Sequence, residues 1–439
     1  MNVGKHDLMA SVILLTANPL CNNPRVNKEA AALAQAGYQV TVLGAWLDIG
    51  LKQRDQALLQ ALPFIFKPVI DWTLDNFITR LQRQFARARN KLGALFYRAT
   101  GIGNAWQFGY AYYALLRAAR ATHADLYIAH SEAGMLVANK LLNEGYRVGL
   151  DMEDWFSEDL TPDARRQRPI KVLRQLEANL LKNGHHSTCP SQAMSAVLAM
   201  EFDVSAPLVV YNAFPYADRL VITSTPHDRR NLQLVSVHWY SQTIGAGRGL
   251  EDLLAALRHL RTPIELHLRG KPVQGFDVWL AAQMPPAWLG QVFVHDTVVN
   301  DLLLARIAEH DIGFAGEIPY SQNKDLTVSN KILHYLLGGL AVVASDTAGQ
   351  REVADLANST AAKGEVAPVV LYPSGDVLAL AAQLNWLIES KERLLKAKVA
   401  ALAAAKRVFC WENQIPVLLG SVEAALAAGI NKPSNALKA

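Results

Sequence analysis

Near the amino terminus, two short apolar runs stand on either side of an alanine-rich segment. Residues 12–15 are continuously apolar and residues 40–43 are apolar except for Thr41, as strands buried on both faces are. Between them, Asn23 is placed to cap a helix that has Pro24 as its first residue, and Gly37 stands where that helix is expected to stop. This order predicts a strand–helix–strand unit of a parallel, doubly wound sheet.

The same alternation resumes after residues 215–230, which lack apolar periodicity and are rich in Pro, Ser, Thr and charge, as an interdomain linker is. Strands are expected at residues 232–237, 264–268, 292–294, 312–315 and 369–371, and helices at 250–260 and 301–309. We therefore predict two α/β domains, 1–220 and 225–409, facing each other across a ligand cleft. A helix at about 410–430, beginning near the packing residue Trp411, is expected to pack back on the first domain.

After the first strand–helix–strand unit, residues 71–98 combine helical spacing of large apolar side chains with many arginines. The basic segment 74–98 has two interpretations. It binds an anionic membrane surface or an acidic acceptor, or it is a solvated basic face over an ordinary core contact. A second helix, rich in aromatic residues, is expected at 106–120.

Composition narrows the class of protein. With 439 residues, 51% of them hydrophobic and 19% charged, the chain can fill two cores, and a net charge of +4 gives no reason to expect nucleic acid as a partner. Cys21, Cys189 and Cys410 are too scattered for a disulfide framework or a zinc site, which suits a reducing cytoplasm. No stretch is long and apolar enough to predict a membrane span, so peripheral association at the inner face of the cell membrane is the alternative to a purely cytoplasmic protein.

The segment 329–346 predicts an anion site. Ser329 can cap a helix whose first turn holds Asn330 and Lys331, and glycines at 338 and 339 precede a buried strand. Free N–H groups and the positive end of the helix dipole favour a phosphate at such a start. The alternative is a capped core helix with a chance lysine. A G-x-G-x-x-G motif is missing after the first strand, which argues against a nicotinamide enzyme.

Together these segments carry a family resemblance. In order, the pieces are residues 23–30, 129–132, 151–154, 247–251 and 329–346. The chain resembles bacterial glycosyltransferases of the GT-B fold, most closely the retaining glycosyltransferase family four (group 1), over nearly its whole length. The resemblance implies a nucleotide-sugar donor on the carboxyl-terminal domain, a glycan or lipid-linked acceptor on the amino-terminal domain, retention of configuration, and a role in surface polysaccharide biosynthesis. No Asp-x-Asp motif stands at a strand end, so neither a metal nor a cofactor beyond the nucleotide-sugar is expected.

The resemblance assigns phosphate binding to Arg248, which stands where the family has a lysine, and Lys331 is a second candidate. A family arginine a little before Arg248 is missing, and Arg269 or Lys271 is expected to compensate. Each of these residues could instead be an ordinary surface cation.

The helix that begins after Ser329 departs from the family pattern. Related chains carry a pair of glutamates, the later of which binds the ribose, and here those positions hold Leu326 and His334. A neutral imidazole can hydrogen-bond a ribose hydroxyl, but a packed core histidine is the alternative. Ser329 and Asn330 complete the expected donor site.

On the amino-terminal side, the resemblance places His130 beside the transferred sugar, where it binds and positions hydroxyls. Glu153 and Asp154 are candidates for acceptor binding, and the alternative, which explains most of the acidic residues here better, is an acidic loop that caps the next helix. Asn18 and Arg25 could clamp a diphosphate or an anionic acceptor, or Arg25 could simply anchor its loop.

Two other classes of protein fit the same pattern. A nucleotide-sugar epimerase or hydrolase shares the fold but does not need the basic segment 74–98. A non-catalytic protein that binds sugar nucleotides or glycans would account for the missing glutamate pair and the missing arginine.

Overall fold

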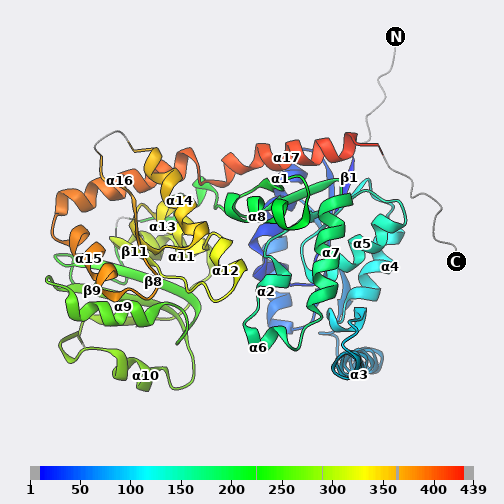
Figure 1. The fold of residues 1–439 in the computed structure, drawn as a ribbon, viewed down its shortest axis with the longest axis horizontal. Coiled ribbons are helices and arrows are strands. Elements are labelled where there is room, and N and C mark those ends of the chain that lie inside the picture. The colour runs from blue at the N-terminus through cyan, green and yellow to red at the C-terminus, as the bar shows by residue number, and fades with distance from the viewer. Residues whose placement is uncertain (1–9, 224, 289, 362–364, 430–439) are drawn as a thin grey trace, which may run out of the picture. The chain divides into compact units, whose positions relative to one another are not determined.

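The computed structural model describes residues 10–223, 225–288, 290–361 and 365–429. The chain forms two compact units, each built around its own sheet (Figure 1). The first unit contains the chain up to Cys189, then Ser195–Val210, and the chain from Ile415 onward. The second contains Pro190–Met194 and Tyr211–Gln414.

The sheet of the first unit has seven parallel strands in the order β3-β2-β1-β4-β5-β6-β7. They are β1 (Ser11–Leu15), β2 (Gln39–Trp46), β3 (Ile65–Asp71), β4 (Leu126–Ala129), β5 (Val148–Asp151), β6 (His186–Cys189) and β7 (Leu208–Val209). The chain winds outward from β1 to one edge of the sheet and then from β4 to the other. The loops after β1 and β4 therefore diverge, which makes this pair the topological switch point of the sheet.

The helices of the first unit follow the alternation that the sequence predicts. They are α1 (Pro24–Gln35), α2 (Ile49–Leu59), α3 (Phe77–Thr100), α4 (Tyr112–Thr122), α5 (Glu132–Asn143), α6 (Pro162–Arg165), α7 (Ile170–Asn183) and α8 (Gln192–Phe202), with 3-10 turns η1 (Leu20–Asn22), η2 (Ala105–Gln107) and η3 (Phe156–Glu158). The last helix, α17 (Trp411–Ala427), also attaches here, since Ser421 Oγ lies 2.8 Å from His186 Nδ1 and Arg147 donates to the carbonyl of Ala428.

The sheet of the second unit has six parallel strands in the order β10-β9-β8-β11-β12-β13. They are β8 (Val235–Ile244), β9 (Ile264–Pro272), β10 (Val292–His295), β11 (Ile312–Ala315), β12 (Ala341–Ser345) and β13 (Val369–Tyr372). The helices are α9 (Leu250–Ala256), α10 (Phe276–Gln283), α11 (Asn300–Ala308), α12 (Gln322–Leu326), α13 (Asn330–Gly338), α14 (Ala348–Ser359), α15 (Val377–Ile388) and α16 (Lys391–Arg407), with η4 (Tyr216–Val221), η5 (Leu257–His259) and η6 (Pro286–Trp288).

Alternate side chains of β8 show how this sheet is covered on both faces. Val237 and Trp239 belong to a core that also contains Leu253 of α9 and Leu384 of α15. His238, between them, lies against α13, where the Tyr335 hydroxyl donates to the His238 carbonyl. The arrangement is the doubly wound one expected from the sequence.

The predicted ends of two helices are confirmed in detail. The Asn23 side chain accepts a hydrogen bond from the N–H of Val26, and Gly37, just past the end of α1, has φ 98°. Ser329 caps α13 by accepting from the N–H of Lys331, and Gly339 ends that helix in the left-handed conformation. Short polar side chains at the start and glycine at the end decided both boundaries.

Three predicted boundaries are wrong. The strand expected at 232–237 begins at Val235, because a turn bonds the N–H of Leu234 to the carbonyl of Asn231. The helix expected at 106–120 is broken into η2 and α4 by Gly109, which has φ 87°. The basic segment is helical only from Phe77, since the residues up to Asp71 form β3 and the helix is capped by Asn76.

Among the described residues, no helix is long and apolar enough to cross a bilayer.

Candidate functional site

In the second unit, the switch point lies between β8 and β11, and the loops at their carboxyl ends touch. Gly249, at the start of α9, has φ 77°, and a Cβ added to it would overlap the carbonyl oxygen of Gly316. Only glycine permits this backbone-to-backbone contact. The loop that carries Arg248 is thereby held against the loop that carries Glu317, at the place where ligands bind in open α/β sheets.

Glu317 is the residue of this region that sequence reasoning missed. Its carboxylate lies 2.6 Å from Lys331 Nζ and accepts a hydrogen bond of 2.8 Å from Ser329 Oγ. Burial would raise the pKa of Glu317, but the charge of Lys331 and the hydrogen bonds from Lys331 and Ser329 outweigh burial and lower it. The signal available in the sequence was an acidic residue two positions after the apolar strand at 312–315.

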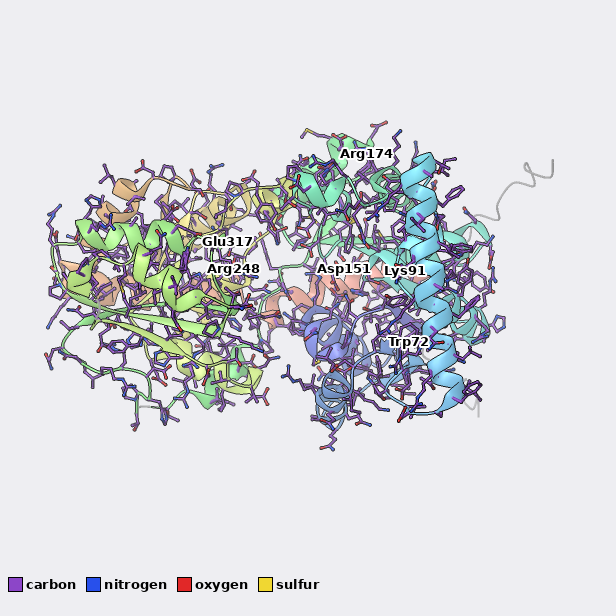
Figure 2. All side chains as sticks on the ribbon, turned by 90° about the horizontal axis from the view of Figure 1, so that it is seen from below. Trp72, Lys91, Asp151, Arg174, Arg248 and Glu317 are labelled. Carbon is purple, nitrogen blue, oxygen red and sulfur yellow. The ribbon has the colours of Figure 1, made fainter. Side chains whose placement is uncertain are left out.

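The side chains of the expected phosphate-binding residues differ in how far they are exposed to solvent. Arg248 is exposed and its guanidinium donates to Ser241 Oγ at 3.0 Å; Figure 2 labels it together with Glu317. Asn330 accepts a hydrogen bond from the Asn212 amide, at the exposed first turn of α13. Lys331 is partly exposed at the same turn. The structure thus brings Ser329, Asn330 and Lys331 together at one helix start.

His334, where related chains hold a glutamate, is fixed on two sides. Its Nδ1 lies 2.6 Å from the hydroxyl of Tyr240, and its ring stacks on Phe214 with centroids 3.4 Å apart. Burial, reinforced by Glu317, raises the pKa of Tyr240, so the phenol is neutral and bonds the imidazole as a neutral partner. Sequence reasoning did not find Tyr240 because it lies beyond the strand expected at 232–237, in the part of β8 that the sequence did not predict.

The two cations that were expected to replace a missing arginine differ in burial. Arg269 is buried, where it pairs with Asp228 and donates to the carbonyl of Asp296. Lys271 is exposed, and it lies inside β9 and not in a loop after it. Of the two, only Lys271 has an accessible charge.

In the first unit, the switch point lies between β1 and β4. The N–H of His130 donates to the carbonyl of Leu15, and Ser131 Oγ accepts from the N–H of Ala17. Asn18 is exposed in the loop after β1. The structure therefore places Asn18 and the loop after His130 at the same edge of the sheet.

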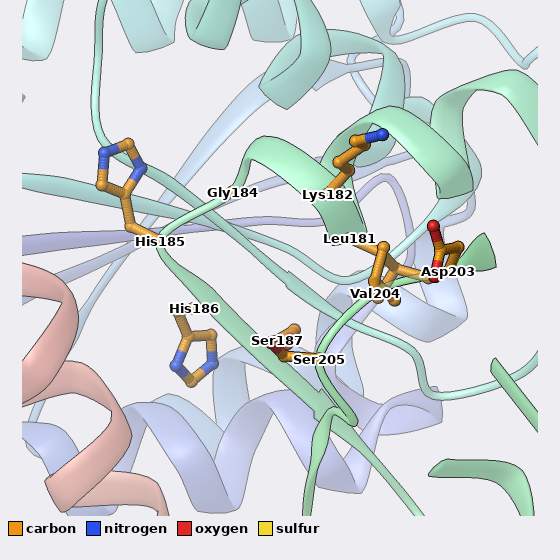
Figure 3. A pocket seen from close by; sticks show the side chains of 9 residues that line it. All are labelled: Leu181, Lys182, Gly184, His185, His186, Ser187, Asp203, Val204 and Ser205. Atoms are coloured by element: carbon orange, nitrogen blue, oxygen red, sulfur yellow. The ribbon is translucent and has the colours of Figure 1, made fainter. Parts of the chain in front are cut away.

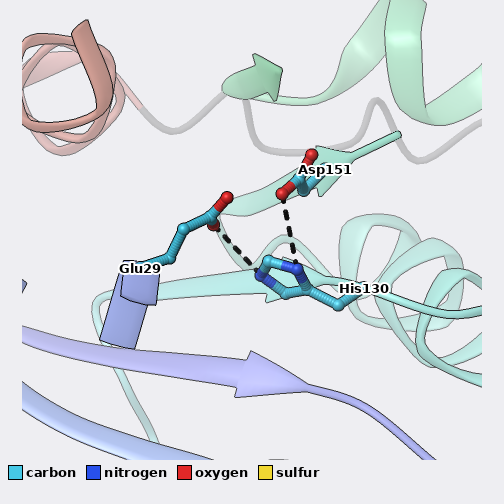
Figure 4. A group of neighbouring side chains, drawn as sticks. All are labelled: Glu29, His130 and Asp151. Atoms are coloured by element: carbon cyan, nitrogen blue, oxygen red, sulfur yellow. Dashed lines mark ion pairs between the residues drawn. The ribbon is translucent and has the colours of Figure 1, made fainter. Parts of the chain in front are cut away.

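The side chain of His130 is completely buried among carboxylates (Figure 4). Its Nδ1 lies 3.1 Å from Glu153 and 3.5 Å from Asp151, and its Nε2 lies 3.5 Å from Glu29. Glu153 also accepts from the Asn23 amide, and its side chain is 18% exposed. A sugar that approaches this edge meets Glu153 before His130.

Arg25 anchors the same cluster from α1. Its Nε lies 2.5 Å from Asp151 and 3.2 Å from Glu29, and its Nη1 donates to the carbonyl of Val210. Burial would lower the pKa of Arg25, but the two carboxylates raise it overall. The guanidinium is thus a buried counter-charge to these carboxylates.

The pKa values of the two carboxyl groups bound by Arg25 are shifted in opposite directions. Burial and the neighbouring Asp151 raise the pKa of Glu29 well above its ordinary value. Burial would also raise the pKa of Asp151, but Arg25 and the hydrogen bond from Glu29 lower it. One proton on Glu29 and one charge on Asp151 therefore balance Arg25. Asp154 lies beside this group and is half-buried.

Glu29, His130 and Asp151 are close enough together to hold a metal ion. The guanidinium of Arg25 already contacts both carboxylates, and its positive charge opposes a dication at that position. The donor set therefore fits an ion-pair network better than a metal centre. The absence of a metal from the reaction stays a prediction.

A polar hollow of about 360 Å³ lies elsewhere in the first unit (Figure 3). It is lined by Leu181, Lys182, Gly184, His185, His186, Ser187, Asp203, Val204 and Ser205. Because His186 begins β6, the hollow lies at the amino end of that strand, whereas the residues considered above follow the carboxyl ends. It is not part of either switch point.

Comparisons with known proteins place the fold. No protein-family model matches the sequence, and no curated protein matches it. Among solved structures, HepE of Anabaena in complex with UDP-glucose is similar at 15% identity, covering 94% of this chain and 100% of that one, with a TM-score of 0.65. Sucrose-phosphate synthase of Thermosynechococcus elongatus is similar at 12% identity, covering 96% and 100%, with a TM-score of 0.66.

A third similar structure, assigned as a UDP-N-acetylglucosamine 2-epimerase of Listeria monocytogenes, has 12% identity, covers 96% of this chain and 98% of that one, and has a TM-score of 0.56. These likenesses and the two doubly wound units define the GT-B fold, as the sequence predicted. At such identities the likeness extends to the fold alone.

Proposed function

We propose that this protein is a glycosyltransferase that moves a sugar from a nucleotide-sugar to a glycan or lipid-linked acceptor, with retention and without a metal, in surface polysaccharide biosynthesis. The observation that carries the proposal is the group at the switch point of the second unit. There, Arg248, Glu317 and Lys331 lie around touching loops and a capped helix start.

The chemistry of the donor explains these residue types. A nucleoside diphosphate leaves with growing negative charge, and fixed cations and helix N–H groups stabilise such charge. Arg248 has a guanidinium fork for phosphate oxygens, and Lys331 has three N–H donors, one of which points to Glu317. Glu317 would accept hydrogen bonds from sugar hydroxyls, next to the phosphates that the two cations hold.

His334 would then receive the ribose. Tyr240 and Phe214 hold its ring in one orientation. His334 lies about one turn after the capped start of α13. We assign the ribose contact to this imidazole because it stands where related chains hold a ribose-binding glutamate, and an imidazole can hydrogen-bond a hydroxyl.

For the first unit, we assign acceptor binding to Asn18, Glu153 and Asp154. Glu153 is the outermost carboxylate of its cluster and is positioned by Asn23 and His130. His130 and Arg25 act through Glu153 and Asp151 as positioning residues. This assignment modifies the expectation of a direct contact between His130 and the sugar, because the His130 side chain is buried.

The first experiment is a thermal-shift and calorimetric screen of nucleoside diphosphates. It starts with UDP because the similar structure of HepE contains UDP-glucose. Arg248→Ala should weaken binding about tenfold or more, the usual effect of losing a charged hydrogen bond. Arg258→Ala, also an exposed arginine next to α9, is the matched control. Equal affinity in the wild type and in both variants would remove this phosphate site.

The epimerase or hydrolase alternative is motivated by the similar structure from Listeria monocytogenes. Nucleotide release measured with and without acceptor separates the classes, since a transferase releases nucleotide faster with its acceptor. Release at the same rate without acceptor supports hydrolysis, whereas conversion of the donor sugar without release supports epimerisation. Tight nucleotide binding with no release under either condition supports a non-catalytic binding protein. The anomeric configuration of the product, read by NMR, tests retention.

A further inference from the structure

Helix α3 packs on the first unit through its small and polar side chains. Its buried residues are Thr79, Ala86 and Gly93, which follow heptad spacing along one face. On the same face, the Asn90 amide donates to the carbonyl of Trp106, and the Tyr97 hydroxyl donates to a carbonyl of the first unit. A Cβ on Gly93 would overlap the Trp106 side chain, so the helix lies as close as its backbone allows.

The large apolar side chains of α3 point the other way. Phe77 is 79% exposed, Phe85 68% and Leu92 57%, and the remaining exposed members of this outer face are Ile78, Leu81, Leu95 and Phe96. With 3.6 residues per turn, these positions fall within an arc of roughly 100°. A surface helix of a globular protein normally buries such a stripe. In α3 the apolar stripe is exposed, and the small and polar side chains are buried. This contradicts the interpretation of segment 74–98 as a basic face over an ordinary core contact.

Basic residues border the exposed apolar face. The sequence of α3 contains Arg80, Arg83, Arg87, Arg89, Lys91 and Arg98 and no acidic residue. Arg80, Arg87, Lys91 and Arg98 share one flank of the helix, as their spacing shows. Figure 2 shows α3 as the long light-blue helix labelled at Lys91. Arg80 pairs with Asp75, and both of those side chains are largely exposed.

We propose that the outer face of α3 is a docking surface for an anionic lipid bilayer, with the helix lying in the plane of the interface. Apolar side chains enter the acyl boundary and the basic flank meets anionic headgroups, which is how interfacial helices bind. Charge decides between this occupant and a second copy of the chain. Two such faces in contact would bring two rows of cations together, whereas anionic headgroups neutralise one row.

The inference goes beyond the proposed transfer reaction and does not depend on it. If both hold, α3 brings the unit proposed to bind the acceptor to the surface where a lipid-linked acceptor resides. Nucleotide binding, which tests the second unit, is measured separately from vesicle binding, which tests α3.

The test is flotation of the full-length protein with vesicles of phosphatidylcholine alone or mixed with phosphatidylglycerol. The wild type should float with the anionic vesicles, less with the neutral ones, and less again in high salt. Phe85→Ser/Leu92→Ser should lower partitioning about tenfold or more, since each side chain loses its transfer into the interface. Arg87→Glu/Lys91→Glu should abolish the preference for anionic vesicles.

Matched controls come from the second unit. Leu378→Ser/Leu395→Ser removes two equally exposed leucines, and Arg258→Glu/Lys391→Glu makes the same change in net charge on exposed residues. Both controls should float like the wild type. All replaced side chains are exposed, so an unchanged melting temperature shows that each variant is folded.

Three results would overturn the proposal. One is a wild type that stays unbound with anionic vesicles at low salt. Another is a Phe85→Ser/Leu92→Ser variant that floats as well as the wild type. The third is a wild-type dimer in solution that the same variant converts to a monomer without any loss of flotation, because α3 would then be covered by a second copy.

Discussion

The carboxylate of Glu317 lies 2.6 Å from the ammonium nitrogen of Lys331, so the two charges beside the start of α13 balance each other. Sequence reasoning identified the lysine but not its partner. Under the proposed function, the two residues have separable effects on the donor, Lys331 through the phosphates and Glu317 through the sugar.

Lys331→Met should weaken UDP binding about tenfold, because a charged donor to phosphate is lost. Glu317→Gln should leave UDP affinity unchanged or higher, since it removes a negative charge near the phosphates, and should reduce the gain in affinity that the sugar adds. Calorimetry with UDP and UDP-glucose measures both effects. Lys396→Met, an exposed lysine paired with Glu392, is the control. Equal loss of UDP affinity in Lys331→Met and Glu317→Gln would contradict the division of roles.

The hydrogen bond between Tyr240 and His334 predicts a second effect on the donor. Tyr240→Phe keeps the ring but removes the hydroxyl that orients the imidazole, so it should weaken UDP binding several-fold, by about 1 kcal/mol. His334→Ala should weaken it at least as much. If both variants lower only the melting temperature and leave UDP affinity intact, His334 is a packing residue.

The parts of this fold that the sequence predicted well are those decided locally. Asn23 and Ser329 cap their helices because a short polar side chain reaches a free N–H, and Gly37 and Gly339 end the same helices because they adopt positive φ. The apolar strand at 312–315 was also found from local sequence, since a short run without polar residues can be recognised without its partners.

The parts that the sequence did not predict depend on distant residues. His130 was expected beside a sugar, but its burial results from Glu29, Asp151 and Glu153, which come from three other segments. The outward face of α3 could not be deduced either, because periodicity identifies an apolar stripe but not the direction in which it points. The predicted ligand site between the two domains stays a prediction.

The raised pKa of Glu29 predicts how stability depends on pH. The native state keeps a proton on Glu29 above the ordinary carboxyl pKa of about 4.5, whereas the unfolded state releases it. The contribution of Glu29 to the free energy of unfolding therefore falls as pH rises above about 4.5, by at most about 1.4 kcal/mol per pH unit. Urea unfolding of the wild type and Glu29→Gln from pH 5 to 8 measures the difference, which should shift in favour of the variant as pH rises. A constant difference would show that Glu29 is ionised in the native state.

Buried histidines of the second unit predict the opposite dependence. His310 stacks on His238, with ring centroids 4.6 Å apart, and burial, followed by the neighbouring charges, lowers the pKa of both well below the ordinary value. Below about pH 6.5 the unfolded chain gains protons that the native state does not, so stability falls as the solution is acidified.

His310→Leu tests this dependence, because neither ring nitrogen of His310 has a hydrogen-bond partner in the described residues. The variant should be as stable as the wild type or more so at pH 7, and its free energy of unfolding should fall less steeply between pH 6.5 and 5. His259→Leu, at an exposed histidine, should keep the wild-type slope. A slope in His310→Leu as steep as that of the wild type would refute the assignment.

The contact between Gly249 and Gly316 also bears on how a protein of this kind can diversify. Since a side chain at position 249 would overlap the carbonyl of Gly316, the closeness of the two loops depends on glycine there. If this is the donor site, neighbouring loop positions could change the groups offered to a sugar while this contact keeps the phosphate-binding cations in place. Donor preference would then change through substitutions around a constant frame, whereas a substitution at Gly249 would move the frame itself.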